Sequence, residues 1–115
     1  MNLLTRAQHA GVDILTVAVF ALAPAVLGLE GTAATLAYVL AGVHLLMTLL
    51  TAGLPGAPGR LVPLPVHGLV EAVVGVALGL IGWLAYDGTE QAFYLVMAAL
   101  ILLVFAITPY LAPSS

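Results

Sequence analysis

Two histidine–carboxylate pairs are the residues of this sequence best suited to chemistry. His9 is followed four residues later by Asp13, and His67 is followed four residues later by Glu71. Side chains four residues apart share one face of a helix, so each histidine is expected to reach its own carboxylate. Two imidazoles and two carboxylates supply the nitrogen and oxygen ligands that zinc, manganese or iron accept. The pairs therefore predict a metal site or a proton relay.

A structural interpretation explains the same pairs. Asp13 and Glu71 fall about one turn inside apolar segments. An ionised carboxylate costs roughly 2.5–3.5 kcal/mol at mid-membrane depth and less near the interface. Hydrogen bonds from His9 and His67 would satisfy these carboxylates and anchor the helix ends. Four-helix proteins that bind two metal ions use Glu-x-x-His motifs and further carboxylates, which this chain lacks. Both interpretations stay open.

A third histidine is expected deeper in the membrane. His44 lies nine residues before Gly53, which is roughly 13 Å along a helix, and Asp13 is expected about two turns nearer to the same membrane face. Thr48, one turn from His44, is expected closer to the level of Asp13, so the three residues form a candidate column. The column indicates a proton or cation path. His44 is also a candidate axial haem ligand, paired with a second His44 across a homodimer. The structural interpretation is that His44 donates one interhelical hydrogen bond worth about 0.6–2 kcal/mol.

The sequence lacks the motifs of common enzymes. It contains no cysteine, which excludes disulfides, iron–sulfur clusters and thiolate metal sites. It has no glycine-rich phosphate loop, no Ser/His/Asp set and no His-Glu-x-x-His pair. A substrate transporter usually has a broken helix at mid-membrane, and no segment shows one. We therefore expect that the protein is not an enzyme.

The composition places these residues in a membrane. Of 115 residues, 63% are hydrophobic and 6% are charged, against about 25% charged in soluble proteins. So few charges cannot cover the surface of a soluble domain. Two arginines without any lysine cannot neutralise a nucleic-acid backbone, which excludes nucleic acid as a partner. The expected environment is the lipid bilayer.

Four apolar segments are long enough to span a bilayer, which takes about 20 residues. They are expected at residues 9–28, 32–53, 65–86 and 90–110. Short turns with glycine and an acid separate the first from the second and the third from the fourth, and Thr32 is expected to cap the second helix. Three prolines and two glycines prevent a helix in the linker 54–64. The predicted fold is all-α, a single transmembrane domain over 1–115.

The two halves of the chain repeat. A shift of 58 residues places His9 on His67, and after a one-residue gap a shift of 57 places Thr51 on Thr108. Each repeat is one helical hairpin, at about 9–53 and 65–110. Because each repeat has two spans, both enter the membrane from the same side. The pseudo-twofold axis is then expected along the membrane normal.

The few charges predict the orientation. Arg6 and Arg60 lie on one side of the membrane, and Glu30, Asp87 and Glu90 lie on the other. Positive residues favour the cytoplasmic side. We therefore expect both termini and the proline-rich linker in the cytoplasm.

The stretch 60–71, Arg-Leu-Val-Pro-Leu-Pro-Val-His-Gly-Leu-Val-Glu, resembles the start of the second repeat in SPW repeat membrane proteins. In that family each first helix opens with a histidine and a carboxylate four residues on, and ends in Ser-Pro-Trp. Here the first copy keeps the proline as Pro24, and the second keeps the tryptophan as Trp83. The resemblance spans nearly the whole chain. It implies a two-hairpin fold in a prokaryotic inner (cytoplasmic) membrane, and it implies no particular activity.

Small residues at helical spacing predict close packing. They lie on the second and third segments, at Ala37, Ala41, Gly75, Gly79 and Gly82. Such small-x3-small spacings serve contacts within a bundle or in a dimer. Pro24 is expected to kink the first helix near its outer end. Four aromatic residues fit an interfacial belt, namely Trp83, Tyr86, Tyr94 and Tyr110.

These features favour a small structural or accessory membrane protein that is oligomeric or a subunit of a larger complex. The alternative is an ion- or proton-conducting, or a metal- or haem-binding, membrane protein that uses the three histidines and the two buried carboxylates. The sequence identifies no cofactor.

Overall fold

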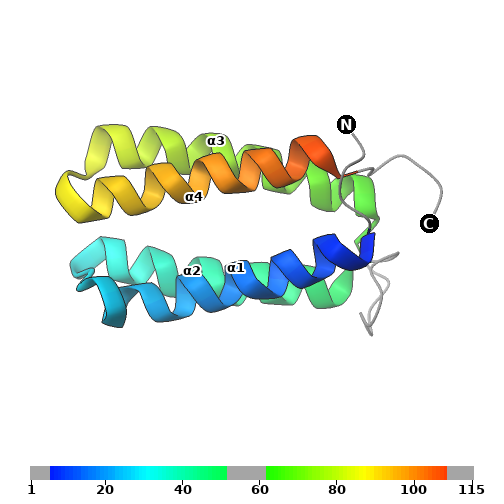
Figure 1. The fold of residues 1–115 in the computed structure, drawn as a ribbon, viewed down its shortest axis with the longest axis horizontal. Helices are drawn as coiled ribbons and strands as arrows, with labels where there is room; N and C mark the ends of the chain where they lie inside the picture. The colour runs from blue at the N-terminus through cyan, green and yellow to red at the C-terminus, as the bar shows by residue number, and fades with distance from the viewer. Residues whose placement is uncertain (1–5, 52–61, 109–115) are drawn as a thin grey trace.

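Four helices arranged as two hairpins make up the described part of the chain, residues 6–51 and 62–108 of a computed structural model (Figure 1). Their bounds are α1 Arg6–Leu27, α2 Gly31–Leu50, α3 Leu64–Ala85 and α4 Gly88–Ile107. All four are apolar and long enough to cross a bilayer. The predicted all-α, four-helix membrane fold is therefore confirmed.

The helices begin and end close to the predicted residues, with differences at one end of the bundle. α1 begins at Arg6 rather than His9, because a helix can continue into polar residues before the apolar run starts. α2 and α4 end three residues earlier than expected, since Thr51 and Thr108 have extended backbones. Residues 52–61, which include most of the predicted linker, and residues 109–115, which include Tyr110 of the predicted aromatic belt, lie outside the described residues.

The turns at the opposite end differ from the prediction in their caps. Glu30 is the N-cap of α2 and makes no side-chain capping bond, so the expectation that Thr32 caps this helix was wrong. The Thr32 hydroxyl instead hydrogen-bonds to that of Tyr86 at 3.1 Å. Gly31 and Gly88 open α2 and α4 with φ of 57°, a conformation that favours glycine. Pro24 lies inside α1, which continues to Leu27, and its kink stays a prediction.

Within the second hairpin, glycines let α3 approach α4 closely. A Cβ added at Gly75 would lie 2.7 Å from Leu102 Cδ2, and one at Gly82 would lie 3.0 Å from the Cβ of Tyr94. At Gly79 the nearest side-chain atom would be 3.7 Å away. The small residues of α3 thus face a neighbour in the same chain, as small-residue packing requires.

Aromatic and small residues of the core join the two hairpins. The buried Tyr94 of α4 donates its hydroxyl to the Ala33 carbonyl of α2 at 2.6 Å. The rings of Phe20 in α1 and Phe93 in α4 meet edge to face at 5.7 Å. The small α2 residues that share this core include Ala37 and Ala41. Because Tyr94 is fully buried, its predicted place in an interfacial belt was wrong.

Candidate functional site: a buried histidine–carboxylate cluster

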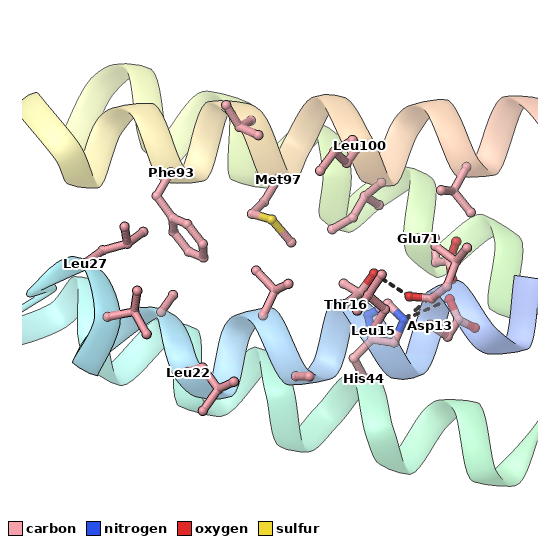
Figure 2. Close-up of a pocket in the computed structure, with 18 residues that line it drawn as sticks. Asp13, Leu15, Thr16, Leu22, Leu27, His44, Glu71, Phe93, Met97 and Leu100 are labelled. Carbon is pink, nitrogen blue, oxygen red and sulfur yellow. Dashed lines mark hydrogen bonds and ion pairs between the residues drawn. The ribbon is translucent and has the colours of Figure 1, made fainter.

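Five polar side chains meet between α1, α2 and α3, near the end of the bundle where α1 and α3 begin. We call His9, Asp13, His44, His67 and Glu71 the histidine–carboxylate cluster. The first helix supplies two of them, the second one and the third two. Four are at most 3% exposed, and His44 is 9% exposed. Figure 2 shows Asp13, His44 and Glu71 converging at one end of the space between α1 and α4.

Glu71 lies at the centre of the histidines. Its Oε1 is 2.6 Å from His67 Nε2, 3.1 Å from His9 Nε2 and 3.8 Å from His44 Nε2. The bond to His67 is the within-helix contact that the four-residue spacing predicts. The contact to His9 crosses from α3 to α1. One carboxylate oxygen therefore faces three imidazole nitrogens from three helices.

Asp13 mirrors this arrangement on α1. Its Oδ1 is 3.1 Å from His9 Nε2 and 3.2 Å from His44 Nε2, and its Oδ2 is 3.2 Å from His67 Nε2. Each histidine of the two sequence pairs thus contacts both carboxylates rather than its own alone. The two pairs form one site between the hairpins.

His44 lies at the level of Asp13, nearer to the end of the bundle than the sequence indicated. Its Nε2 is 3.2 Å from Asp13 Oδ1, so the two side chains meet at one level rather than two turns apart. The reason lies in the helix bounds, because α1 begins at Arg6, seven residues before Asp13, and α2 ends at Leu50, six residues after His44. Thr48 completes the expected column, with its hydroxyl 3.5 Å from Asp13 Oδ2. His44 Nε2, which an axial haem ligand would need, is directed at the carboxylates.

Two threonines hold the far side of the histidine rings. His9 Nδ1 is 2.8 Å from the Thr108 hydroxyl, and His67 Nδ1 is 2.7 Å from the Thr51 hydroxyl. Each hydroxyl donates its single hydrogen to the backbone carbonyl four residues before it. It can therefore only accept from the imidazole. We assign the hydrogen to Nδ1 in both rings, which turns the Nε2 atoms toward the carboxylates.

The threonine bonds cross between the hairpins in a symmetric way. His9 of the first repeat bonds to Thr108 of the second, and His67 of the second bonds to Thr51 of the first. The shift of 57 residues that aligns Thr51 with Thr108 already indicated that the two threonines occupy matching positions. Their role was missed because residues at helix ends can reach a partner on any neighbouring helix.

With the hydrogens on Nδ1, the lone pairs of the histidine Nε2 atoms face those of the carboxylate oxygens. Neutral imidazoles with hydrogen on Nδ1 direct the Nε2 lone pair of His9 and His67 at the carboxylate oxygens of Asp13 and Glu71. Nitrogen–oxygen distances of 2.6–3.2 Å require a positive charge between the atoms. Protons on Nε2 or a bound cation can supply that charge.

A single metal ion fits among four of these residues. His9, Asp13, His67 and Glu71 each offer one ligand atom, and the four atoms lie within 4.8 Å of one another. A tetrahedral zinc ion with bonds of 2.0–2.2 Å holds its ligand atoms roughly 3.3–3.6 Å apart. Small side-chain movements would bring the four atoms to that spacing. His44 Nε2, near both carboxylates, is placed to act as a fifth ligand.

Two cavities reach the cluster. The larger, about 630 Å³, extends between α1 and α4 and ends at Asp13, His44 and Glu71. The smaller, about 30 Å³, reaches His44 and Glu71 from the side of α2 and α3, and it is large enough for a water molecule. The cluster is therefore enclosed by protein on most sides but is accessible from within the bilayer.

No protein-family model, curated protein or solved structure matches this chain. The resemblance to the SPW repeat family stays a prediction that rests on the residues quoted above.

Proposed function

We propose that this chain is a metal-binding membrane protein that holds one divalent transition-metal ion in the histidine–carboxylate cluster. The observation that carries the proposal is the convergence of four ligand atoms within 4.8 Å from two helices that belong to different hairpins. The ion would join the two hairpins at the end of the bundle where α1 and α3 begin. Zinc suits the site best because it accepts mixed nitrogen and oxygen ligands in a tetrahedral arrangement.

Charge balance supports the metal. Asp13 and Glu71 carry two negative charges at most 3% exposed, and an uncompensated buried charge is strongly destabilising. A divalent ion neutralises both carboxylates while the histidines stay neutral. The outer bonds from Thr51 and Thr108 hold two imidazoles with Nε2 inward, which is the arrangement that metal-bound histidines commonly show.

The structural or accessory role favoured by the sequence is compatible with this proposal, since an ion that joins two hairpins is a structural element. Self-association, further subunits and the absence of enzymatic activity stay predictions. We also propose that the cluster lies at the cytoplasmic side of a prokaryotic inner membrane, with both termini in the cytoplasm. Arg6 and Arg60 on that side and the acids of the opposite turns support this orientation.

Elemental analysis of the purified chain tests the proposal. The protein is expressed without a metal-chelating tag, purified in detergent, and assayed for zinc, manganese and iron. We expect about one ion per chain, and loss of the ion in Asp13→Asn and Glu71→Gln, because each removes a charged ligand. Equilibrium dialysis against zinc then measures affinity for the wild type and each variant.

Matched controls lie in the turns at the other end of the bundle. Asp87→Asn and Glu30→Gln make the same chemical changes at exposed residues whose side chains make no capping bonds. These variants are expected to retain the ion. A metal-free wild type that does not take up zinc on dialysis contradicts the proposal and favours protonated histidines in direct ion pairs with the carboxylates.

A further inference from the structure

The larger cavity has the form of a binding site for a lipid-soluble molecule. It follows α1 from Asp13 to Leu27, a length of roughly 20 Å along the helix. Its walls between α1 and α4 are apolar, and several wall residues are also exposed on the surface that faces lipid: Leu22, Val26, Val96 and Leu100. In Figure 2 the polar side chains gather at one end, and Phe93 and Leu27 lie at the other. The cavity is thus an apolar slot with one polar end.

The polar end presents mainly hydrogen-bond acceptors. Asp13 and Glu71 contribute carboxylate oxygens. Thr16 also lines this end, and its hydroxyl donates its hydrogen to the Val12 carbonyl at 2.8 Å, so its oxygen is left to accept. A ligand head that donates a hydrogen bond therefore suits this end, which His44 also lines.

The depth of the cluster selects a small head. Asp13 lies five residues into the apolar span that begins at Gln8, roughly 8 Å along the helix. A phosphate head drawn to this depth would lose its hydration, and a cluster without net charge offers nothing to compensate that loss. With the proposed divalent ion in place the cluster has no net charge, so an ammonium head gains no ion pair. A neutral hydroxyl is a small donor that needs no compensating charge, and this choice of head rests on the proposed function.

We infer that the cavity between α1 and α4 binds a neutral single-chain lipid with a hydroxyl head, the chain lying along the apolar walls and the hydroxyl donating to the acceptors at Asp13, Thr16 and Glu71. The occupant enters sideways from the bilayer. This goes beyond metal binding, because it gives the cluster a ligand from the membrane itself.

Photolabelling of the full chain in zinc-loaded phosphatidylcholine vesicles tests the inference. The probe is a hexadecanol that carries a diazirine midway along its chain, and labelled residues are mapped by mass spectrometry. We expect labels on Leu22, Val96 and Leu100 in the cavity and weak labelling of Leu46 and Leu103, which are exposed outside it. A phosphatidylcholine with the same diazirine is expected to label both groups evenly. Equal labelling of the cavity by both probes would show ordinary boundary lipid and overturn the inference.

Competition identifies the head group. Unlabelled hexadecanol is expected to displace the probe, and its methyl ether, which cannot donate, about tenfold less well. Decylhydroquinone, another hydroxyl donor on a chain, tests whether the hydroxyl is aromatic rather than aliphatic. Displacement of the probe by hexadecanol or by decylhydroquinone supports a lipid with a hydroxyl head. An ether that competes as well as the alcohol, or hexadecylamine that competes better, overturns it.

A pair of variants on α4 separates this inference from the metal site. Leu100→Trp fills the cavity and is expected to remove the labelling, whereas Leu103→Trp, at a similarly exposed residue outside the cavity, is expected to preserve it. Zinc content is measured in the same samples. Zinc without cavity labelling in the wild type overturns this inference and leaves the proposed function intact. Cavity labelling by the alcohol without bound zinc overturns the proposed metal site and leaves the lipid-binding cavity intact. Absence of both zinc and cavity labelling overturns both proposals.

Discussion

The threonines behind the histidine rings give the sharpest test of the metal site. Thr51→Val and Thr108→Val keep the size and branching of the side chain and remove one hydroxyl each. The hydroxyl accepts from Nδ1 of His67 or His9 at 2.7 and 2.8 Å. Both rings are fully buried, so water does not replace the lost acceptor.

The magnitude follows from that burial. A buried donor left without an acceptor costs about 1–3 kcal/mol, and loss of the outer partner of a metal-bound histidine typically weakens binding 10–100-fold, or about 1.4–2.8 kcal/mol. We therefore expect zinc affinity to fall 10–100-fold in each single variant. Thr51 and Thr108 occupy matching positions of the two repeats, so the two losses are expected to be similar, and the double variant to bind more weakly than either.

Zinc affinity is measured in detergent by competition with a chromophoric chelator, and the spectrum of the cobalt-substituted protein reports ligand geometry. Thr35→Val is the control. Its hydroxyl also donates to a carbonyl four residues earlier, at 3.2 Å, but it is exposed and lies nine residues before His44 on α2. Unchanged affinity in both Thr51→Val and Thr108→Val, or an equal loss in Thr35→Val, would refute the proposed role of the hydroxyls in orienting the ligands.

Two further predictions concern the bundle that positions the cluster, both measured by thermal unfolding in detergent. Gly75→Ala places a Cβ 2.7 Å from Leu102 and is expected to lower the free energy of unfolding by about 1–3 kcal/mol. Its control is Gly42→Ala, which has no atom within 4 Å of the new Cβ and is expected to cause no loss. Similar behaviour of the two variants would contradict the close α3–α4 contact. Tyr94→Phe removes the 2.6 Å bond to an α2 carbonyl and is expected to lower stability by about 0.6–1.5 kcal/mol. The exposed Tyr38→Phe serves as its control, and an equal effect there would count against a hairpin-joining role for the Tyr94 hydroxyl.

Hydrophobicity and local chemistry predicted the helices well because these signals act over short stretches of chain. About 20 apolar residues must form a helix to cross a bilayer, since lipid offers no other partners for backbone groups. The errors lie at helix ends, where Thr32 was expected to cap and Thr51 to continue the helix. At those positions a polar side chain chooses among backbone and tertiary partners of similar energy, which local sequence does not distinguish.

The candidate site was predicted only in part. Helical periodicity places Asp13 beside His9 and Glu71 beside His67, and the structure has both contacts. The same periodicity says nothing about where one helix lies against another. The level of His44 was therefore estimated from residue counts along the predicted helices, and the estimate was wrong because α1 begins before His9 and α2 ends before Gly53.

The sequence by itself determined that this chain is a four-helix membrane protein with two buried carboxylates, each one helical turn from a histidine. Those are properties of composition and of spacing along one helix. The tertiary structure decided that the two pairs form one cluster, that His44 joins it, that Thr51 and Thr108 bond across the hairpins, and that a cavity reaches it from the bilayer. The reason is that these contacts join residues up to 99 positions apart, and their formation depends on how the side chains of neighbouring helices pack together.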